Sequence, residues 1–259
     1  MNENTCQPAP YDAVPCEVVV TAREYADGAR FPMHDHRRGQ FAYAACGVIT
    51  VNTERGNWAV PPQRAIWVPP GVRHGMQMRG TVTMLNTYVS PAAALRVGLP
   101  NVCQVFAVSA LVRQLLTLAL EVPGRYAGNE RDAHLMGLLL HEIARMPPLY
   151  LNAPLPAEPR LDKACQRFLN APSLEIGVDE MARWANMSRR NFTRQFRQHT
   201  GISFLQWRQQ ACLLAATVKL GNGEAITQVA VALGYSSPSA FSTVFKKVLG
   251  EVPSRYFGA

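Results

Sequence analysis

Two histidines, His34 and His36, stand one residue apart in a segment rich in strand-forming residues. Because alternate residues of a β-strand share a face, both imidazoles can bind one ion, while Asp35 between them is expected at the surface. Neutral imidazole nitrogens suit divalent transition metals, among them zinc, nickel, iron, copper and manganese. The spacing therefore predicts a metal-binding chemistry, which needs further ligands from elsewhere in the chain.

A second group of chemically capable residues lies on a predicted helix near the C-terminus. Ser188 is a good N-cap, and it opens a helix to His199 whose Phe192 and Phe196 face inward at positions i and i+4. A short apolar support helix, 178–184, precedes it, so that the pair has a helix-turn-helix pattern. The outward face of the second helix carries five side chains: Arg189, Arg190, Thr193, Arg194 and Arg197.

The same plan recurs 49 positions further along. Residues 226–233 supply the support helix and residues 234–236 the turn, and Ser237-Pro238 supplies an N-cap followed by a proline that loses no helical hydrogen bond. Phe241 and Phe245 repeat the inward pair. One helix-turn-helix pattern is a weak indicator because many helical hairpins bind nothing. Two matched copies with basic outer faces predict double-stranded DNA as a partner.

The distribution of charge favours the same partner. Residues 160–259 contain thirteen lysines and arginines against six acidic residues, a net charge of +7, whereas residues 1–159 have a net charge of +1. A basic domain joined to a nearly neutral one is typical of phosphate binding, whereas a merely solvated surface mixes signs along its length.

The C-terminal hundred residues resemble the DNA-binding domain of AraC/XylS-type transcription regulators. That resemblance implies two recognition helices in successive segments of the major groove, joined by a long helix, here Phe204 to Leu220, with half-sites about one helical turn apart. The residues that carry it are Met181, Ala182, Ser188, Phe192, Phe196, Gly201, Ala230, Leu233, Gly234, Tyr235, Ser239, Phe241, Phe245, Lys246, Lys247, Gly250, Pro253 and Tyr256.

The resemblance also implies roles for single side chains. Base readers would be Arg190, Thr193 and Arg194, since arginine can donate two hydrogen bonds to guanine, while Arg189 and Arg197 would meet phosphates. The second copy is less equipped to read bases, so its role would be mostly to position the protein. Its outward residues are Pro238, Ser239, Ser242, Thr243, Lys246 and Lys247. Cys212 departs from the family, whose members commonly have arginine there, and this puts a linker-helix salt bridge in doubt.

The first ninety residues have short apolar stretches between glycine and proline turns, which predicts a small barrel or a double-sheet jelly roll. Residues 28–47, with His34, His36 and Gln40, resemble the first cupin motif, and Gln40 stands where an acidic ligand is usual. Residues 69–74, ending in His74, resemble the second cupin motif.

A cupin barrel would bring His34, His36, Gln40 and His74 together as candidate ligands of one divalent transition metal. Sensor cupins of transcription regulators often lose the metal and use the pocket for an organic effector, and glutamine is a poorer ligand than glutamate. Both interpretations stay open. Four aromatic residues could line an effector pocket, although aromatic residues at strand spacing also fit plain core: Phe41, Tyr43, Trp58 and Trp67.

Four regions are expected along the chain. Residues 1–90 would form the sensor barrel, residues 147–159, with five prolines, an extended linker, and residues 160–259 the DNA-binding domain. Residues 91–146 would hold a helical pair, 108–121 and 132–146, whose apolar stripes fit either core or interface. In regulators of this type such a pair commonly forms the dimer contact. The predicted fold class is α+β with two domains, a cupin-type barrel or jelly roll with a helical pair and an all-α domain with two helix-turn-helix units.

No run of eighteen apolar residues exists, and the N-terminus lacks a basic segment followed by an apolar export signal. We therefore expect a cytoplasmic, nucleoid-associated protein without a membrane partner. The six cysteines form no C-x-x-C pair and would be reduced there, so packing is expected for most of them, with a redox sensor as the alternative.

Residues 39–43 and 58–69 further resemble the NimR-like branch of these regulators, which extends the likeness over almost the whole chain. It implies a sequence-specific transcription regulator, not an enzyme, whose partners are double-stranded DNA, a small-molecule or metal effector, RNA polymerase and a second copy of the chain. Two other functions are alternatives: a metal-dependent cupin enzyme with a DNA-binding tail, and an architectural DNA-bending protein. The missing carboxylate weakens the enzyme hypothesis, and the architectural one leaves the cupin motifs unexplained.

Overall fold

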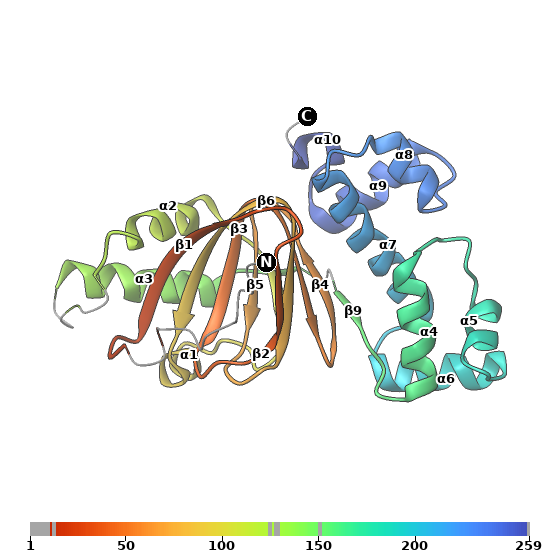
Figure 1. The fold of residues 1–259 in the computed structure, drawn as a ribbon, viewed down its shortest axis with the longest axis horizontal. Coiled ribbons are helices and arrows are strands. Elements are labelled where there is room, and N and C mark those ends of the chain that lie inside the picture. The colour runs from red at the N-terminus through yellow and green to blue at the C-terminus, as the bar shows by residue number, and fades with distance from the viewer. Residues whose placement is uncertain (1–10, 12–13, 124–125, 127–129, 150–151, 258–259) are drawn as a thin grey trace, which may run out of the picture. The chain divides into compact units, whose positions relative to one another are not determined.

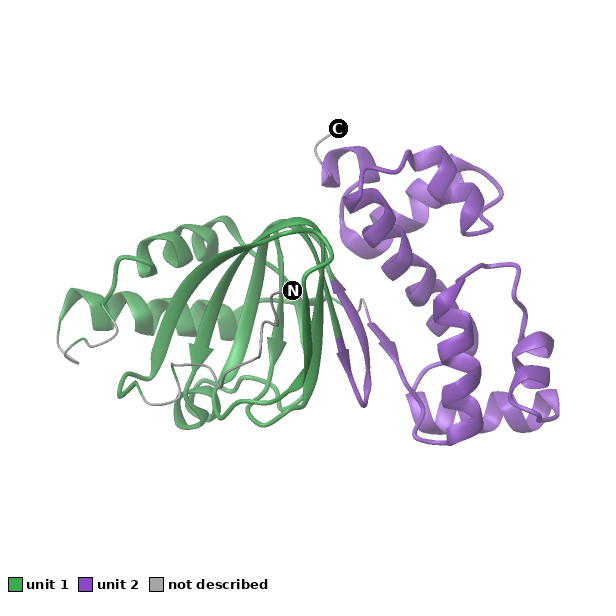
Figure 2. Ribbon diagram, viewed as in Figure 1, with its two compact units in different colours: residues 1–51, 60–149 green, residues 52–59, 150–259 purple. Residues whose placement is uncertain are grey.

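A computed structural model describes residues 11, 14–123, 126, 130–149 and 152–257 (Figure 1). The chain forms two compact units (Figure 2). The first comprises residues 1–51 and 60–149, and the second comprises residues 52–59 and 150–259. The second unit is therefore discontinuous in sequence, because a short stretch from the β-rich half belongs to it.

The first unit is built on an antiparallel sheet in which β1, β6, β3, β5, β7 and β8 are neighbours in that order and β2 pairs with β6. The bounds of its strands are β1 Val18–Tyr25, β2 Arg30–His34, β3 Gly39–Thr53, β5 Arg64–Val68, β6 His74–Val89, β7 Gln104–Ala107 and β8 Pro148–Leu149. Strands β4 (Gly56–Val60) and β9 (Asn152–Pro154) pair with each other. β7 and β8 were not expected, since they lie in segments interpreted as helical and as linker.

Alternation along β3 separates two environments. Gln40 pairs with Val68 and Phe41 with Trp67 in the register with β5, so the polar residue and its aromatic neighbour face opposite sides of the sheet. Phe41 and Trp67 are fully buried in a core shared with the helices of this unit. The other side of the strand carries the polar side chains described below.

Three helices belong to this unit: α1 Pro91–Arg96, α2 Ala110–Ala119 and α3 Arg131–Arg145. Ser90 and Ser109 cap the first two by accepting hydrogen bonds from backbone N–H groups, which satisfies donors that the helix leaves free. The buried face of α2 runs through Leu115 and Leu116, whereas Leu111 and Leu118 remain 49% and 40% exposed. The spacing of Leu111, Leu115 and Leu118 predicts one apolar stripe, but only Leu115 of the three is buried, so the face of α2 that packs is rotated from the one this spacing indicates.

The second unit contains seven helices within the described ranges: α4 Pro159–Asn170, α5 Val178–Trp184, α6 Arg189–Thr200, α7 Phe204–Gly221, α8 Ile226–Ala232, α9 Pro238–Leu249 and α10 Pro253–Tyr256. The support helix α5 has the predicted bounds, and α7 matches the predicted long helix to within one residue. In Figure 1, α7 runs between the group formed by α4, α5 and α6 and the group formed by α8, α9 and α10. Among the residues that the structure describes, no helix is long and apolar enough to cross a membrane.

An aromatic cluster joins α4, α6 and the start of α7. Phe196 of α6 lies edge-on to Phe204 and Trp207 of α7, with ring centroids 5.7 and 5.6 Å apart, and Phe168 of α4 lies 5.2 Å from Trp207. Such edge-to-face pairs add to the stabilisation from burial. The inward phenylalanines of α6 therefore pack this helix against α7.

Residues 147–159 do more than connect the units in sequence. Strand β9 pairs with β4 through Gly56–Pro154 and Trp58–Asn152, and the indole Nε1 of Trp207 donates a 2.8 Å hydrogen bond to the carbonyl oxygen of Pro154. Residues 152–154 of this segment are extended, and Pro154 is also bonded to the long helix α7.

Close packing at the start of β3 leaves no room for a side chain at Gly39. A Cβ atom at Gly39 would overlap the fully buried ring of Trp67, so Gly39→Ala should lower the free energy of unfolding by about 1–3 kcal/mol. Gly137, inside α3, has nothing within 4 Å of a Cβ position, so Gly137→Ala should raise that free energy by about 0.5–1 kcal/mol. Guanidinium denaturation followed by tryptophan fluorescence measures both, and a Gly39→Ala midpoint equal to wild type would contradict the packing described.

Candidate DNA-binding surface and metal centre

Local signals in the sequence build the first helix-turn-helix. Asn186 takes a left-handed conformation, with φ of 52°, at the turn between α5 and α6. The Ser188 hydroxyl then accepts a 3.3 Å hydrogen bond from the backbone N–H of Asn191. Gly201 ends α6 in a left-handed cap. Phe192 and Phe196 are fully buried, which fixes the opposite face of α6 toward solvent.

The solvent face of α6 is a continuous basic surface. All five side chains that were expected to point outward are exposed. One further residue, Gln198, belongs to the same face and was missed, although its spacing of four from Arg194 could have identified it. The surface is formed by Arg189, Arg190, Thr193, Arg194, Arg197 and Gln198.

Contacts within the chain distinguish the members of this surface. Arg189 forms an ion pair of 3.1 Å with Asp179 at the start of α5, and Arg194 donates a 2.9 Å hydrogen bond to the side chain of Asn191. The Thr193 hydroxyl donates to the Arg189 carbonyl oxygen, so its methyl group and lone pairs remain for an outside partner. Both ion-pair partners are largely exposed, so the pair is weak and can be exchanged for a phosphate.

Helix α9 repeats the backbone chemistry of α6 but carries fewer cations. Ser237 caps α9 by accepting from Ala240, and the Thr243 hydroxyl donates to the Ser239 carbonyl as Thr193 does to that of Arg189. Pro238 and Ser239 are exposed and Ser242 is half-buried. The cations of α9, Lys246 and Lys247, lie in its last turn.

Three imidazoles meet in the first unit. His34 is the last residue of β2 and is paired with His74, the first residue of β6, while His36 lies beyond the end of β2. The ring centroids of His34 and His74 are 4.4 Å apart, and those of His36 and His74 are 5.1 Å apart. One ligating nitrogen from each ring lies within 4.8 Å of the others. The convergence of these histidines is as expected, although His34 and His36 do not share a strand.

A backbone carbonyl oxygen lies beside Nδ1 of each of the three rings. His34 Nδ1 lies 2.9 Å from the Pro32 oxygen, His36 Nδ1 lies 2.5 Å from the Arg38 oxygen, and His74 Nδ1 lies 2.8 Å from the Val72 oxygen. A carbonyl oxygen only accepts, so Nδ1 is the donor in these contacts, and Nε2 of His34 and His74 is the nitrogen left for a ligand. His36 has a second acceptor beside it, because Gln40 Oε1 lies 3.1 Å from its Nε2. Hydrogen bonds of this kind orient metal-ligating histidines.

Burial keeps His74 in its neutral form. Loss of solvation lowers its pKa to about 4, against a smaller opposing effect of the hydrogen bond to Val72, and the nearby His34 and His36 lower it further. His74 Nε2 is buried and has no hydrogen-bond partner among the described residues. A buried lone pair without a donor is costly to the fold unless something binds it, and a transition-metal ion fits that demand.

Two buried amides lie beside the imidazoles. The side-chain oxygen Oε1 of Gln40 lies 3.1 Å from His36 Nε2, and Gln40 Nε2 donates a 2.7 Å hydrogen bond to Asn86 Oδ1. Sequence reasoning missed Asn86. Its even spacing from His74 along β6 places both on one face of that strand and could have indicated it.

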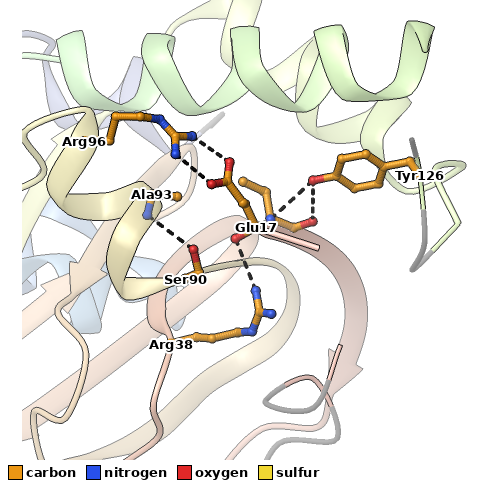
Figure 3. Close-up of polar contacts among 7 residues, drawn as sticks. Glu17, Arg38, Ser90, Ala93, Arg96 and Tyr126 are labelled. Atoms are coloured by element: carbon orange, nitrogen blue, oxygen red, sulfur yellow. Dashed lines mark hydrogen bonds and ion pairs between the residues drawn. The ribbon is translucent and has the colours of Figure 1, made fainter. Parts of the chain in front are cut away.

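The backbone that carries His36 is itself held in place. Arg38, which is 6% exposed, donates hydrogen bonds to the carbonyl oxygens of Val14, Cys16 and Glu17. Figure 3 shows the Arg38–Glu17 contact, together with the bidentate ion pair of Glu17 with Arg96, both at 2.6 Å. That pair lowers the pKa of the Glu17 carboxyl group. The backbone carbonyl group beside His36 Nδ1 therefore belongs to Arg38, whose side chain is held in place by three hydrogen bonds.

The four aromatic residues expected around an effector do not surround the histidines. Phe41, Tyr43 and Trp67 belong to the hydrophobic core shared with α2 and α3, on the side of β3 opposite to Gln40. Trp58 is buried on β4. Burial also raises the pKa of the Cys212 thiol to about 12 and that of Cys165 further, which makes both poor candidates for redox sensing.

Comparison with known proteins matches both units. A helix-turn-helix domain model matches residues 181–259, and a model described as an AraC-like ligand binding domain matches residues 18–141. The chain is 37% identical over 229 residues to the HTH-type transcriptional regulator NimR of Escherichia coli K12, covering 87% of this chain and 81% of that one. It is 29% identical to the arabinose operon regulatory protein of the same organism over 138 residues, which is 50% of this chain and 46% of that one.

Among solved structures, ToxT from Vibrio cholerae aligns over 94% of this chain and 98% of its own, at 11% identity and a TM-score of 0.39. The NimR match, with both domain models, shows the family directly. The chain belongs to the AraC family of DNA-binding transcription regulators, with a ligand-binding domain followed by a helix-turn-helix domain.

Proposed function

We propose that this regulator controls transcription through a cupin-like sensor that holds one divalent transition metal on His34, His36 and His74. The observation that carries this proposal is the convergence of the three rings, whose potential ligand atoms lie within 4.8 Å of one another while each Nδ1 lies beside a backbone carbonyl oxygen. The ion would contribute charge and open coordination positions for a small-molecule effector. Gln40 contacts His36 and would act beside the ligands rather than replace one.

We further propose that the two recognition helices divide the work on DNA. On α6, Arg190, Thr193 and Arg194 would read base edges while Arg189 and Arg197 hold phosphates. On α9, the small polar residues and the lysines Lys246 and Lys247 would mainly fix the register of the protein on the duplex. The difference in cationic side chains between the two exposed faces supports this division.

The remaining partners are RNA polymerase, the usual target of a DNA-bound regulator, and a second copy of the chain. Leu111 and Leu118 of α2 and Leu138 of α3 are between 40% and 49% exposed, although other residues of both helices pack the same core. We propose that these leucines form the contact between two copies.

The base-reading proposal separates two arginines of one helix. Arg194→Ala should weaken binding to the operator by about 1–3 kcal/mol and relax specificity at one base step. Arg197→Ala should weaken specific and random duplexes alike and reduce the dependence of affinity on salt. Titrations of both duplexes at several salt concentrations measure this, and an equal loss on both duplexes for Arg194→Ala would reject its role in reading bases.

The metal proposal is tested on the full-length protein. Wild type purified without chelator should contain about one zinc or other transition metal per chain, and His36→Ala should lose it, because two imidazoles hold an ion far less tightly. Added metal should raise the melting temperature of wild type but not of the variant, since a ligand of the native state stabilises it. His134→Ala removes an exposed histidine of α3 outside the cluster and should behave as wild type. Metal-free wild type that zinc does not stabilise would refute the site.

The dimer proposal predicts an effect of charge on the exposed leucines. Leu138→Asp should shift the sedimentation coefficient from that of a dimer to that of a monomer, because a carboxylate buried in an apolar contact is costly. Leu95→Asp, at an 83% exposed leucine of α1, is the matched control and should leave the dimer intact. A dimer that survives Leu138→Asp would place the contact elsewhere.

A further inference from the structure

The histidine cluster carries no negative charge of its own. Within the part of the chain that the structure describes, the group of potential ligands consists of His34, His36 and His74 alone, without an aspartate or glutamate. The side chains that extend it, Gln40 and Asn86, are neutral amides. A divalent ion bound there, as proposed above, would keep its full double positive charge.

That charge would lie in a poorly solvated place. His74 is fully buried, and His36, Gln40 and Asn86 are exposed by 8%, 4% and 2%. A buried charge is costly unless an opposite charge or several hydrogen bonds compensate it. Neutral ligands orient the ion but leave this compensation incomplete.

Among the described residues, no buried aspartate or glutamate lies at the cluster. The guanidinium group of Arg38, on the residue whose carbonyl lies beside His36, is 6% exposed and bonded to three carbonyl oxygens, which are neutral acceptors. The carboxylate of Glu17, on the same segment as those carbonyls, is engaged by Arg96 (Figure 3). The charge of Asp35 acts on His74 and raises its pKa, but Asp35 is exposed to solvent and is not one of the clustered ligands.

We infer that the metal-loaded sensor binds its effector as an anion, through a carboxylate or comparable anionic donor placed directly on the metal. Three histidine ligands leave coordination positions open for such a donor. Gln40 Oε1 faces His36 Nε2, and the bond between the Gln40 and Asn86 side chains uses only one of their N–H groups, so others remain for hydrogen bonds to an anion. The glutamine at position 40 is then a specificity-determining residue, since it leaves the negative charge for the effector to provide. This inference rests on the proposed metal site.

The test uses full-length protein loaded with cobalt(II), whose visible absorption reports its ligands, and azide as the anionic probe. Azide should change the spectrum saturably in wild type. Gln40→Glu should still bind cobalt but weaken azide by about tenfold or more, because the added carboxylate cancels part of the charge that attracts the anion. Gln166→Glu, which adds the same charge at an exposed position of α4, should leave azide affinity at the wild-type value.

Asn86→Asp adds a carboxylate from the other amide and should also weaken azide, which keeps the inference testable if Gln40→Glu does not fold. Cobalt-loaded wild type whose spectrum azide does not alter would overturn the inference while leaving the metal site intact. Equal azide affinity in wild type and a folded, cobalt-loaded Gln40→Glu would overturn it as well. A protein that takes up no cobalt would refute the metal site itself, and with it the anion.

Discussion

Hydrogen bonds from imidazole Nδ1 to backbone carbonyl oxygens hold the three clustered histidine rings of the ligand-binding domain in place. Each acceptor lies two residues from its histidine along the chain, at Pro32, Arg38 and Val72. The rings are therefore held by the local backbone and do not need a bound ligand to orient them. The pairing of β2 with β6 then sets His34 opposite His74. A site whose ligands are oriented in advance loses little conformational entropy when it is filled.

Local contacts also hold the two helices α6 and α9 of the DNA-binding unit. A serine cap, a threonine bonded one turn back and an inward phenylalanine pair occur in both α6 and α9, so the two helices are anchored by the same local chemistry. What differs is confined to the exposed side chains. The helical scaffold is therefore present twice, with different side chains exposed on each copy.

The structure follows the sequence most closely where signals are local. The bounds of α5 and the caps at Ser188 and Ser237 could be predicted because each depends on neighbours within one or two turns. Strands β7 and β8 could not, since a few residues of strand gain their identity from partners far away in sequence. The convergence of His74 with His34 and His36 was inferred only through motif resemblance.

The face of β3 on which each side chain lies was harder to predict than the bounds of the helices. Both sides of β3 are buried near Phe41, so hydrophobicity does not alternate there, and an effector pocket could not be distinguished from the core beneath the helices. Asn86 escaped notice for the same reason, as one polar residue in a long buried strand. The positions of the ring protons depend on backbone geometry that no residue pattern encodes.

The bonds of strand β9 affect where the DNA-binding unit could be joined to a different ligand-binding domain in a chimeric protein. The compact unit that holds the recognition helices also includes residues 52–59, and Trp207 of the long helix depends on the Pro154 carbonyl for its indole hydrogen bond. A chimera joined at residue 160 would transplant the helices but leave the buried indole N–H without its acceptor. A junction placed ahead of residue 152, with a hairpin able to receive β9, would carry the complete module from one sensor to another.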